Sequence, residues 1–170
     1  MKFVFATYFR VLKRMVDTSF LEPVLEGLSQ FAHLLNVEYF GDLTIAMESL
    51  VEKQSLSILS SVHCINAVFV ILSGEGAALN IDPSKFYRLM YGLLCSLPFE
   101  RSYEKMVKQI DLVIRTLHIM FIVRRKQVPL PRVAAFVKRL VDVAVYLPST
   151  CSIAILALLR QIIMVNLYFI

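Results

Sequence analysis

The sequence predicts an all-α protein, built as a HEAT/armadillo-like helical repeat (α-solenoid) of about eight helices. Three observations support this fold class. Apolar residues recur at helical spacing along the chain, no alternating run of strand length competes with them, and 58% of the 170 residues are hydrophobic. Globular proteins average roughly 45–50% apolar residues, so a stack of helices with little surface per helix suits this composition. A compact helical bundle is the alternative.

Four helices are expected in the first half of the chain, near 1–17, 21–35, 38–53 and 55–73. The second begins close to Pro23, because a proline's missing N–H is harmless in a first helical turn. It carries an apolar stripe that runs from Val24 to Leu35 at helical spacing. Gly74 ends the fourth helix and opens a loop.

Four more helices are expected in the second half, near 83–96, 101–123, 132–147 and 150–168. Asp82 and Pro83 form a start signal, with the aspartate as N-cap and the proline at the first helical position. Pro98 closes that helix. The 129–131 segment, Pro-Leu-Pro, separates the next two helices, and either Ser149 or Thr150 is placed to cap the last.

Taken in pairs, the helices begin near residues 1, 38, 83 and 132. These intervals resemble the roughly 40–47-residue helix pair of HEAT and armadillo arrays. We therefore expect one helical-repeat domain over 1–160, followed by a divergent apolar tail over 161–170. Both ends lack the polar capping face that normally terminates a solenoid, so the chain is expected to be a fragment of a longer protein.

The strongest charge signal is the stretch 124–139, RRKQVPLPRVAAFVKR, which holds no acid. The whole chain has a net charge of +5 and this stretch alone has +6, so the basic character is local. Residues 101–170 hold eleven basic and three acidic side chains, whereas residues 1–55 hold five and seven. The candidate site residues are Arg124, Arg125, Lys126, Arg132, Lys138 and Arg139.

Three interpretations of this stretch stay open: a solvated basic surface, contact with RNA phosphate or an acidic partner, and recognition for nuclear import. Residues 124–126 fall at a predicted helix end, where cations stabilise the helix dipole by about 0.3–1 kcal/mol. Arg132 and Arg139 are seven residues apart and share a helix face. Lys138 lies off that face, so the six charges do not form one stripe.

The sequence offers no site for catalysis, a cofactor or a metal. The histidines His33, His63 and His118 lie far apart, and neither a CxxC pair nor a zinc spacing occurs. The cysteines Cys64 and Cys151 lie in apolar helical context, as does Cys95, which favours reduced core thiols. We therefore expect a non-enzymatic protein without a small-molecule substrate.

A membrane protein is a weaker alternative. The apolar segment 153–170 is long enough to suggest a span, but Arg160 and Gln161 lie near its middle. A central arginine costs about 2.5–3.5 kcal/mol even on permissive insertion scales. The N-terminus is not a good signal peptide, because its short apolar run is broken by Arg10.

Four segments carry a family resemblance: FATYFRVLKR (5–14), PVLEGLSQFAHLLNVEYFGDL (23–43), ILSGEGAALNIDPSKFY (71–87) and RRKQVPLPRVAAFVKRL (124–140). In order and spacing they resemble the nucleolar complex-associated protein 3 family, in the helical domain shared with CCAAT-binding-factor-type proteins. The resemblance covers about residues 5–160, and the terminal segment after about Gln161 does not match.

The resemblance implies a nucleolar and nuclear scaffold in biogenesis of the large (60S) ribosomal subunit and in intranuclear transport of its precursor. It implies a nucleolar complex protein 2-like partner, pre-60S particles, and contacts with rRNA or chromatin. A role in initiating DNA replication is also attributed to the family. A purely protein–protein helical module without nucleic-acid contact remains the alternative. No catalytic residue comes with the resemblance.

Overall fold

A computed structural model of the chain describes residues 7–8, 10–12, 21–31, 37–53, 56–74 and 82–167. The chain divides into two compact units. The N-terminal unit is Met1–Phe86 and the C-terminal unit is Tyr87–Ile170. The boundary between them falls within helix α5, after its first turn.

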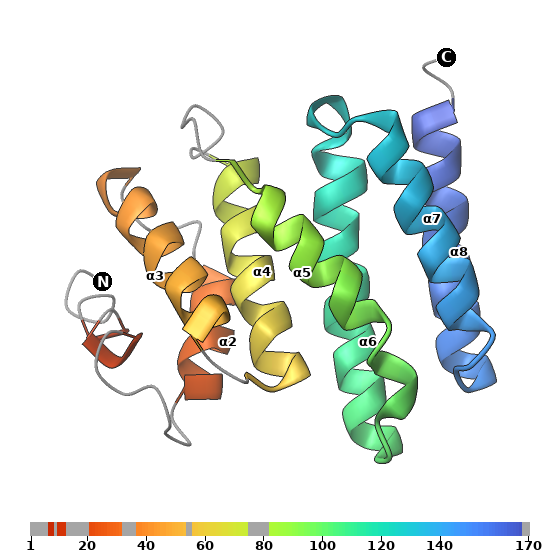
Figure 1. The fold of residues 1–170 in the computed structure, drawn as a ribbon, viewed down its shortest axis with the longest axis horizontal. Helices are drawn as coiled ribbons and strands as arrows, with labels where there is room; N and C mark the ends of the chain where they lie inside the picture. Colours follow the sequence, from red (N-terminus) through yellow and green to blue (C-terminus); the bar gives the residue numbers. More distant parts are fainter. Residues whose placement is uncertain are drawn as a thin grey trace. The chain divides into compact units, whose positions relative to one another are not determined.

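The predicted all-α class is confirmed, because every element in the described ranges is helical and none is a strand (Figure 1). The α-helices lie close to seven of the eight predicted ones; the first, 1–17, falls mostly outside the described residues. Their bounds are α2 (Leu21–Phe31), α3 (Phe40–Lys53), α4 (Ile58–Ser73), α5 (Ser84–Leu94), α6 (Tyr103–His118), α7 (Leu130–Ala144) and α8 (Ser149–Leu167).

Helix α4 forms the core of the N-terminal unit, with twelve of its sixteen residues buried. The hydroxyl of Ser57 caps its start by accepting a hydrogen bond from the Ser60 N–H at 3.1 Å. Its end is closed by the Gly74 N–H, which donates to the Ile71 carbonyl at 3.1 Å, as the sequence predicted. Helices α2 and α3 pack against α4 through regularly spaced apolar residues, which include Leu21, Leu25, Leu28, Phe40, Leu43, Met47 and Leu50.

An aromatic cluster holds the C-terminal unit together, where α8 packs against both α6 and α7. Phe136 of α7 lies at its centre, with ring centroids 4.8 Å from Phe121 and 5.2 Å from Tyr91. Tyr87 lies 6.3 Å from the same ring. These edge and tilted geometries are the favoured ones for aromatic pairs, and each adds about 0.5–1.5 kcal/mol beyond burial.

Helix α6 does not end as a regular α-helix. It passes into a π-helical turn, Ile119–Val123, in which the Arg124 N–H donates to the Ile119 carbonyl at 3.1 Å. The wider turn keeps Met120 and Phe121 fully buried. A short 3-10 helix, Arg125–Gln127, follows directly. The sequence predicted one helix over 101–123 and did not indicate this change of geometry.

Two proline expectations need correction. Pro131 was expected between helices, but it lies in the first turn of α7, where its missing N–H leaves no helical hydrogen bond unmade. Pro129 is the residue just before that helix. Pro98 was expected to close α5, but that helix already ends at Leu94, and Pro98 belongs to a separate 3-10 turn, Leu97–Phe99.

One described helix, over Ser149–Asn166, is long and apolar enough to cross a membrane by length and composition. A single helix of this kind is weak evidence for a span, because core helices pass the same test. Arg160 and Gln161 are both exposed on it. Helix α8 continues to Leu167, and the predicted division into a domain over 1–160 and a tail over 161–170 stays a prediction.

Candidate functional site

The predicted basic residues meet a row of tyrosines within the C-terminal unit. The guanidinium carbon of Arg132 lies 4.4 Å from the ring centroid of Tyr87, and that of Arg139 lies 4.3 Å from the ring centroid of Tyr91. A guanidinium over an aromatic face within about 6 Å is a cation–π contact. The side chains of Arg132 and Arg139 are therefore both in contact with α5.

Helical spacing explains this match. Tyr87, Tyr91 and Cys95 are four residues apart, which places them along one side of α5 and its C-terminal turn. Arg132 and Arg139 are seven apart, or about two turns of α7. The sequence predicted that the two arginines share a face, and the structure directs that face toward α5.

Arg139 is also in contact with sulfur, because its Nη1 donates a hydrogen bond to the Cys95 Sγ. The pKa of the guanidinium is raised chiefly by a hydrogen bond with Tyr91; burial opposes this rise, and the nearby Cys95, Tyr91 and Asp142 add smaller increases. The group stays protonated under all physiological conditions. Arg139 is thus both a charge and a structural contact.

Arg124 belongs to the same contact region. Burial raises the pKa of Tyr87, and this rise is opposed by the nearby charges of Arg124 and Arg132 and by a hydrogen bond from Arg124. Arg124 and Arg125 are half-buried, whereas Lys126 and Lys138 are exposed. The six predicted residues therefore divide into Arg124, Arg132 and Arg139, which contact the tyrosines of α5, and Arg125, Lys126 and Lys138.

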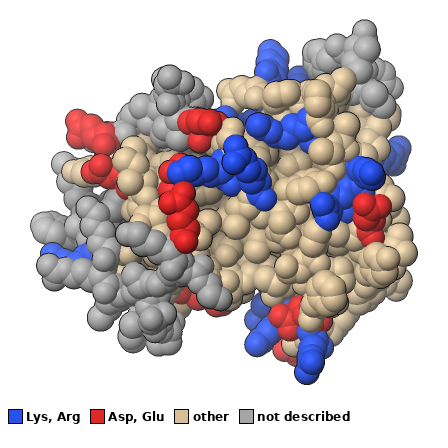
Figure 2. All heavy atoms as spheres, in the orientation of Figure 1, with Lys and Arg blue, Asp and Glu red and all other residues tan. Residues whose placement is uncertain are grey.

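A surface hollow of about 470 Å³ lies at the turn between α6 and α7. Its lining is six consecutive residues, 122–127, which include Arg124, Arg125, Lys126 and Gln127 and no carboxylate. Figure 2 shows Lys and Arg atoms at this turn and further along α7, with other residues between them. The structure thus gathers the three consecutive cations at one hollow and does not join all six into a continuous patch.

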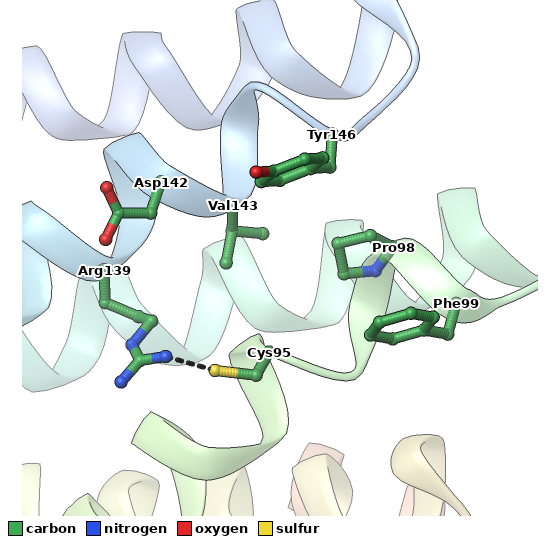
Figure 3. Close-up of a pocket in the computed structure, with 7 residues that line it drawn as sticks. All are labelled: Cys95, Pro98, Phe99, Arg139, Asp142, Val143 and Tyr146. Atoms are coloured by element: carbon green, nitrogen blue, oxygen red, sulfur yellow. Dashed lines mark hydrogen bonds between the residues drawn. The ribbon is translucent and has the colours of Figure 1, made fainter.

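A second pocket, of about 440 Å³, opens beside the Cys95–Arg139 contact (Figure 3). Phe99 and Tyr146 stand at its rim and are 83% and 75% exposed. Aromatic residues are enriched at interfaces, so two exposed aromatics beside one pocket make it a candidate binding surface. The lining residues are Cys95, Pro98, Phe99, Arg139, Asp142, Val143 and Tyr146.

Sequence reasoning did not find this pocket. Phe99 and Tyr146 follow different helices, and each resembles an ordinary apolar residue near a helix end. The available signal was that Phe99 follows Pro98 and Tyr146 precedes Pro148 in two helix connections. Connections carry binding residues disproportionately, so aromatics there were candidates for a surface role.

In the N-terminal unit, a buried hydrogen bond joins Ser29 and His63. The Ser29 Oγ lies 3.1 Å from the His63 Nδ1 and donates its own proton to the Glu26 carbonyl at 2.9 Å. Because the Ser29 hydroxyl proton is used in that bond, the Nδ1–H of His63 is the donor to the Ser29 Oγ. This tautomer is assigned from the hydrogen-bond network. Burial lowers the pKa of His63, against the opposing charges of Glu26 and Glu22. This pair has the geometry of a structural contact between α2 and α4.

The described cysteines and histidines do not form a metal-binding cluster. Cys64 and Cys151 are buried and free, and burial raises the pKa of Cys64 to about 12. Cys95 is half-exposed, so the expectation of a core thiol is wrong for this residue. Within the described ranges, no group of three His, Cys, Asp or Glu side chains could hold a metal ion. His33 lies outside those ranges.

The helical segment that carries both pockets lies within a region matched by a known family. The chain belongs to the CBF/Mak21 family, whose model matches residues 61–167. The family is generally non-catalytic.

Three similar proteins carry the name nucleolar complex protein 3 or nucleolar complex-associated protein 3. The chain is 54% identical over 162 residues to a nucleolar complex protein 3 homolog from Caenorhabditis briggsae, covering 95% of the chain and 21% of the relative. It is 45% identical over 157 residues to the Homo sapiens homolog, covering 92% and 19%. A Saccharomyces cerevisiae nucleolar complex-associated protein 3 is 27% identical over 191 residues, covering 95% and 28%.

These similarities confirm the resemblance predicted from the four sequence segments. They also confirm the predicted nucleolar localisation, because the relatives are named as nucleolar complex proteins. The family implies a role in nucleolar ribosome biogenesis. The chain spans about a fifth of the length of the first two relatives, and none of these findings assigns a function to an individual side chain.

Proposed function

We propose that this chain is a non-enzymatic scaffold in biogenesis of the large ribosomal subunit and in intranuclear transport of its precursor. Family membership over 61–167 is the observation that carries this proposal. The consecutive helices α3 and α4, and likewise α7 and α8, pack together, which also suits a HEAT/armadillo-like solenoid that exposes long surfaces for partners. The scaffold would act through protein–protein and rRNA contacts.

The aromatic pocket supports the protein–protein part of this role. Its rim residues Phe99 and Tyr146 are large, exposed and separated by an apolar hollow, which is the arrangement that receives a partner's apolar anchor. The surrounding unit is strongly basic, so we propose that the occupant is an acidic helical segment with an apolar anchor. A nucleolar complex protein 2-like protein is the partner that the resemblance implies.

Sedimentation of nuclear extract tests the scaffold role. We expect the epitope-tagged chain, expressed in human cells, to enter the gradient fractions that hold large-subunit precursors. A parallel sample treated with ribonuclease separates RNA-dependent from protein-dependent association. The proposal is wrong if the chain is folded by circular dichroism, reaches the nucleolus and still stays in the free fractions.

A paired substitution tests the partner surface. Phe99→Ser combined with Tyr146→Ser should abolish co-purification of nucleolar complex protein 2, because it removes both rim aromatics. The matched control is Val145→Ser with Ile153→Ser, two exposed apolar residues that do not line the pocket. Equal co-purification by both variants would exclude the pocket as the docking site.

The alternative of a purely protein–protein module is favoured by one observation. Arg124, Arg132 and Arg139 are engaged with the tyrosines of α5, so part of the basic stretch serves the fold. In that case charge reversal at all six candidate residues would leave RNA association unchanged. The replication role stays a prediction of the resemblance alone.

A further inference from the structure

We propose that the exposed face of α8 docks an amphipathic helix of a partner protein, one that carries a single carboxylate in the middle of its apolar stripe. This α8 face consists of five exposed residues, Leu156, Ala157, Arg160, Ile163 and Met164. It is separate from the aromatic pocket, because the residues that line that pocket all precede α8. This docking surface adds to the proposed scaffold role and does not depend on it.

Helix α8 is more apolar than its packing explains. It contains no acidic residue, and between Ser149 and Asn166 it is apolar enough to cross a membrane, yet only 28% of those residues are buried. Helix α4 shows the usual outcome for so apolar a helix, since twelve of its sixteen residues are buried. A contiguous apolar patch that stays exposed marks a surface where another molecule binds.

One side of α8 is covered and the other is open. The covered side packs against α6 and α7 and includes the buried residues Ile155, Leu158, Leu159 and Ile162. The α8 face lies on the opposite side, because positions 156, 160, 163 and 164 follow the three- and four-residue spacing of a single helix surface. A stripe of this spacing is the surface that a second helix packs along, so the shape of the face favours a helical partner.

Arg160 determines the chemistry of that partner. It lies at the centre of the α8 face, with Leu156 one turn before it and Ile163 and Met164 one turn after it. The ion pairs within the described ranges do not include Arg160. A helix that covers the face also removes water from the guanidinium, and a buried charge is costly unless an opposite charge accompanies it. The partner therefore needs a carboxylate opposite Arg160, with apolar residues one turn away on both sides.

A second copy of the chain and a lipid surface both fit the α8 face less well. Two copies paired through the centre of this face, parallel or antiparallel, would place their Arg160 guanidinium groups opposite each other, and like charges repel. A helix that lies on a bilayer keeps its cations on the polar face, or near its ends where they reach the interface. Arg160 instead lies in the middle of the apolar face, so a carboxylate-bearing helix is the occupant that this arrangement favours.

Fluorescence anisotropy with a labelled helical peptide of about 20 residues tests the proposal, since much shorter helices are marginal in water. The peptide carries one central glutamate, with leucines four residues before it and three and four residues after it, among alanine and glutamine. Otherwise identical peptides carry glutamine or lysine in place of the glutamate. We expect the glutamate peptide to bind the full chain about tenfold or more tightly than the lysine peptide, because close charge pairs across an interface couple at least this strongly.

Charge reversal on the chain gives a readout that does not rely on loss of binding. Arg160→Glu should exchange the preference, so that the lysine peptide binds more tightly than the glutamate peptide. The matched control is Lys108→Glu, which makes the same charge change at an exposed position on α6 and should keep the preference for glutamate. Leu156→Ser with Met164→Ser should weaken binding of all three peptides, because it removes apolar contacts on both sides of Arg160.

The proposal is wrong if no peptide binds the chain, folded as judged by circular dichroism, or if Lys108→Glu changes the preference as much as Arg160→Glu does. Binding to phosphatidylcholine–phosphatidylserine vesicles that the double serine variant abolishes would assign the face to lipid. A dimer in sedimentation equilibrium that the same variant dissociates would assign it to a second copy. If the chain binds the glutamate peptide and the full-length human homolog does not, a helix of the longer protein itself covers this face.

Discussion

Lys85 in the N-terminal unit and two arginines in the C-terminal unit have different kinds of partner. In the N-terminal unit, which holds six basic and nine acidic side chains, the Lys85 ammonium lies 2.9 Å from Glu52 and 3.1 Å from Glu48. In the C-terminal unit, which holds twelve basic and four acidic side chains, Arg132 and Arg139 lie against tyrosine rings. Lys85 is paired with carboxylates, whereas Arg132 and Arg139 are stacked on aromatic faces; the C-terminal unit also holds one ion pair, Arg115 with Asp111 at 2.8 Å.

The local contact that a cation makes and its contribution to the long-range electrostatic potential are therefore separate properties. A carboxylate cancels the charge of the lysine that it contacts, so Lys85 adds little to the long-range potential of its unit. A tyrosine ring holds an arginine in place but removes none of its charge. The C-terminal unit can therefore use arginines for packing and keep a net charge of +8 that attracts polyanions. Packing and electrostatic attraction are compatible there.

The largest expected effect comes from the aromatic centre of the C-terminal unit. Phe136→Ala should lower the free energy of unfolding by about 3–5 kcal/mol, because it leaves a cavity among the rings that its side chain contacts. Urea unfolding measures the change. Tyr146→Ala is the control, since this exposed aromatic should stay within about 0.5 kcal/mol of the parent. A similar effect of the two substitutions would contradict a packed centre at Phe136.

A smaller effect is expected for the stacked cation itself. Arg132→Met keeps most of the apolar stem and removes the contact with Tyr87, so it should lower the free energy of unfolding by about 0.5–2 kcal/mol. Arg132→Lys keeps the charge, so its free energy of unfolding in urea should lie between those of the parent and of Arg132→Met. Lys126→Met, at an exposed position, is the matched control. If it destabilises as much as Arg132→Met, general charge loss and not stacking explains the result.

The sequence predicted the helices well because apolar spacing is a local property. The stripes of α6 and α7 identify these helices without knowledge of their neighbours. The π turn at Ile119–Val123 could not be predicted, since the same residues would also extend a regular helix. In this turn Met120 and Phe121 are both fully buried.

The candidate site was predictable only in part. Spacing alone placed Arg132 and Arg139 on one face, but not what that face meets, because Tyr87 and Tyr91 are brought there by tertiary packing. A guanidinium that looks like a free charge in the sequence can be a packing group in the fold. The contact between Ser29 and His63, 34 residues apart, was invisible for the same reason.

Acid should destabilise the N-terminal unit through His63. The folded-state pKa of this histidine is lowered from its ordinary 6.5 by burial, so the unfolded chain takes up the proton first as pH falls. The free energy of unfolding should therefore fall as pH drops below about 6.5 toward the folded pKa. Urea unfolding at several pH values measures this, and His63→Asn should remove that part of the dependence.

Two neighbouring acids give this prediction an internal control. Glu26 and Glu22 raise the pKa of His63 and so oppose the effect of burial. Glu26→Gln should therefore deepen the loss of stability in acid, whereas Glu38→Gln should not, because Glu38 is not among the groups that shift this histidine. An unchanged pH profile in both His63→Asn and Glu26→Gln would show that His63 does not carry the acid sensitivity.

The smallest effect is expected at Lys85, and it bears directly on the contrast between carboxylate and aromatic partners. Hydrogen bonds with Glu52 and then Glu48 raise the pKa of Lys85, although its side chain is exposed. Glu52→Gln should lower that pKa, as measured by NMR titration, more than Glu48→Gln does. Unfolding should hardly change, because exposed ion pairs contribute little and salt screens them. If Glu52→Gln instead destabilises the chain as much as Arg132→Met, carboxylate pairing and aromatic stacking are equally structural, and the contrast between the two units fails.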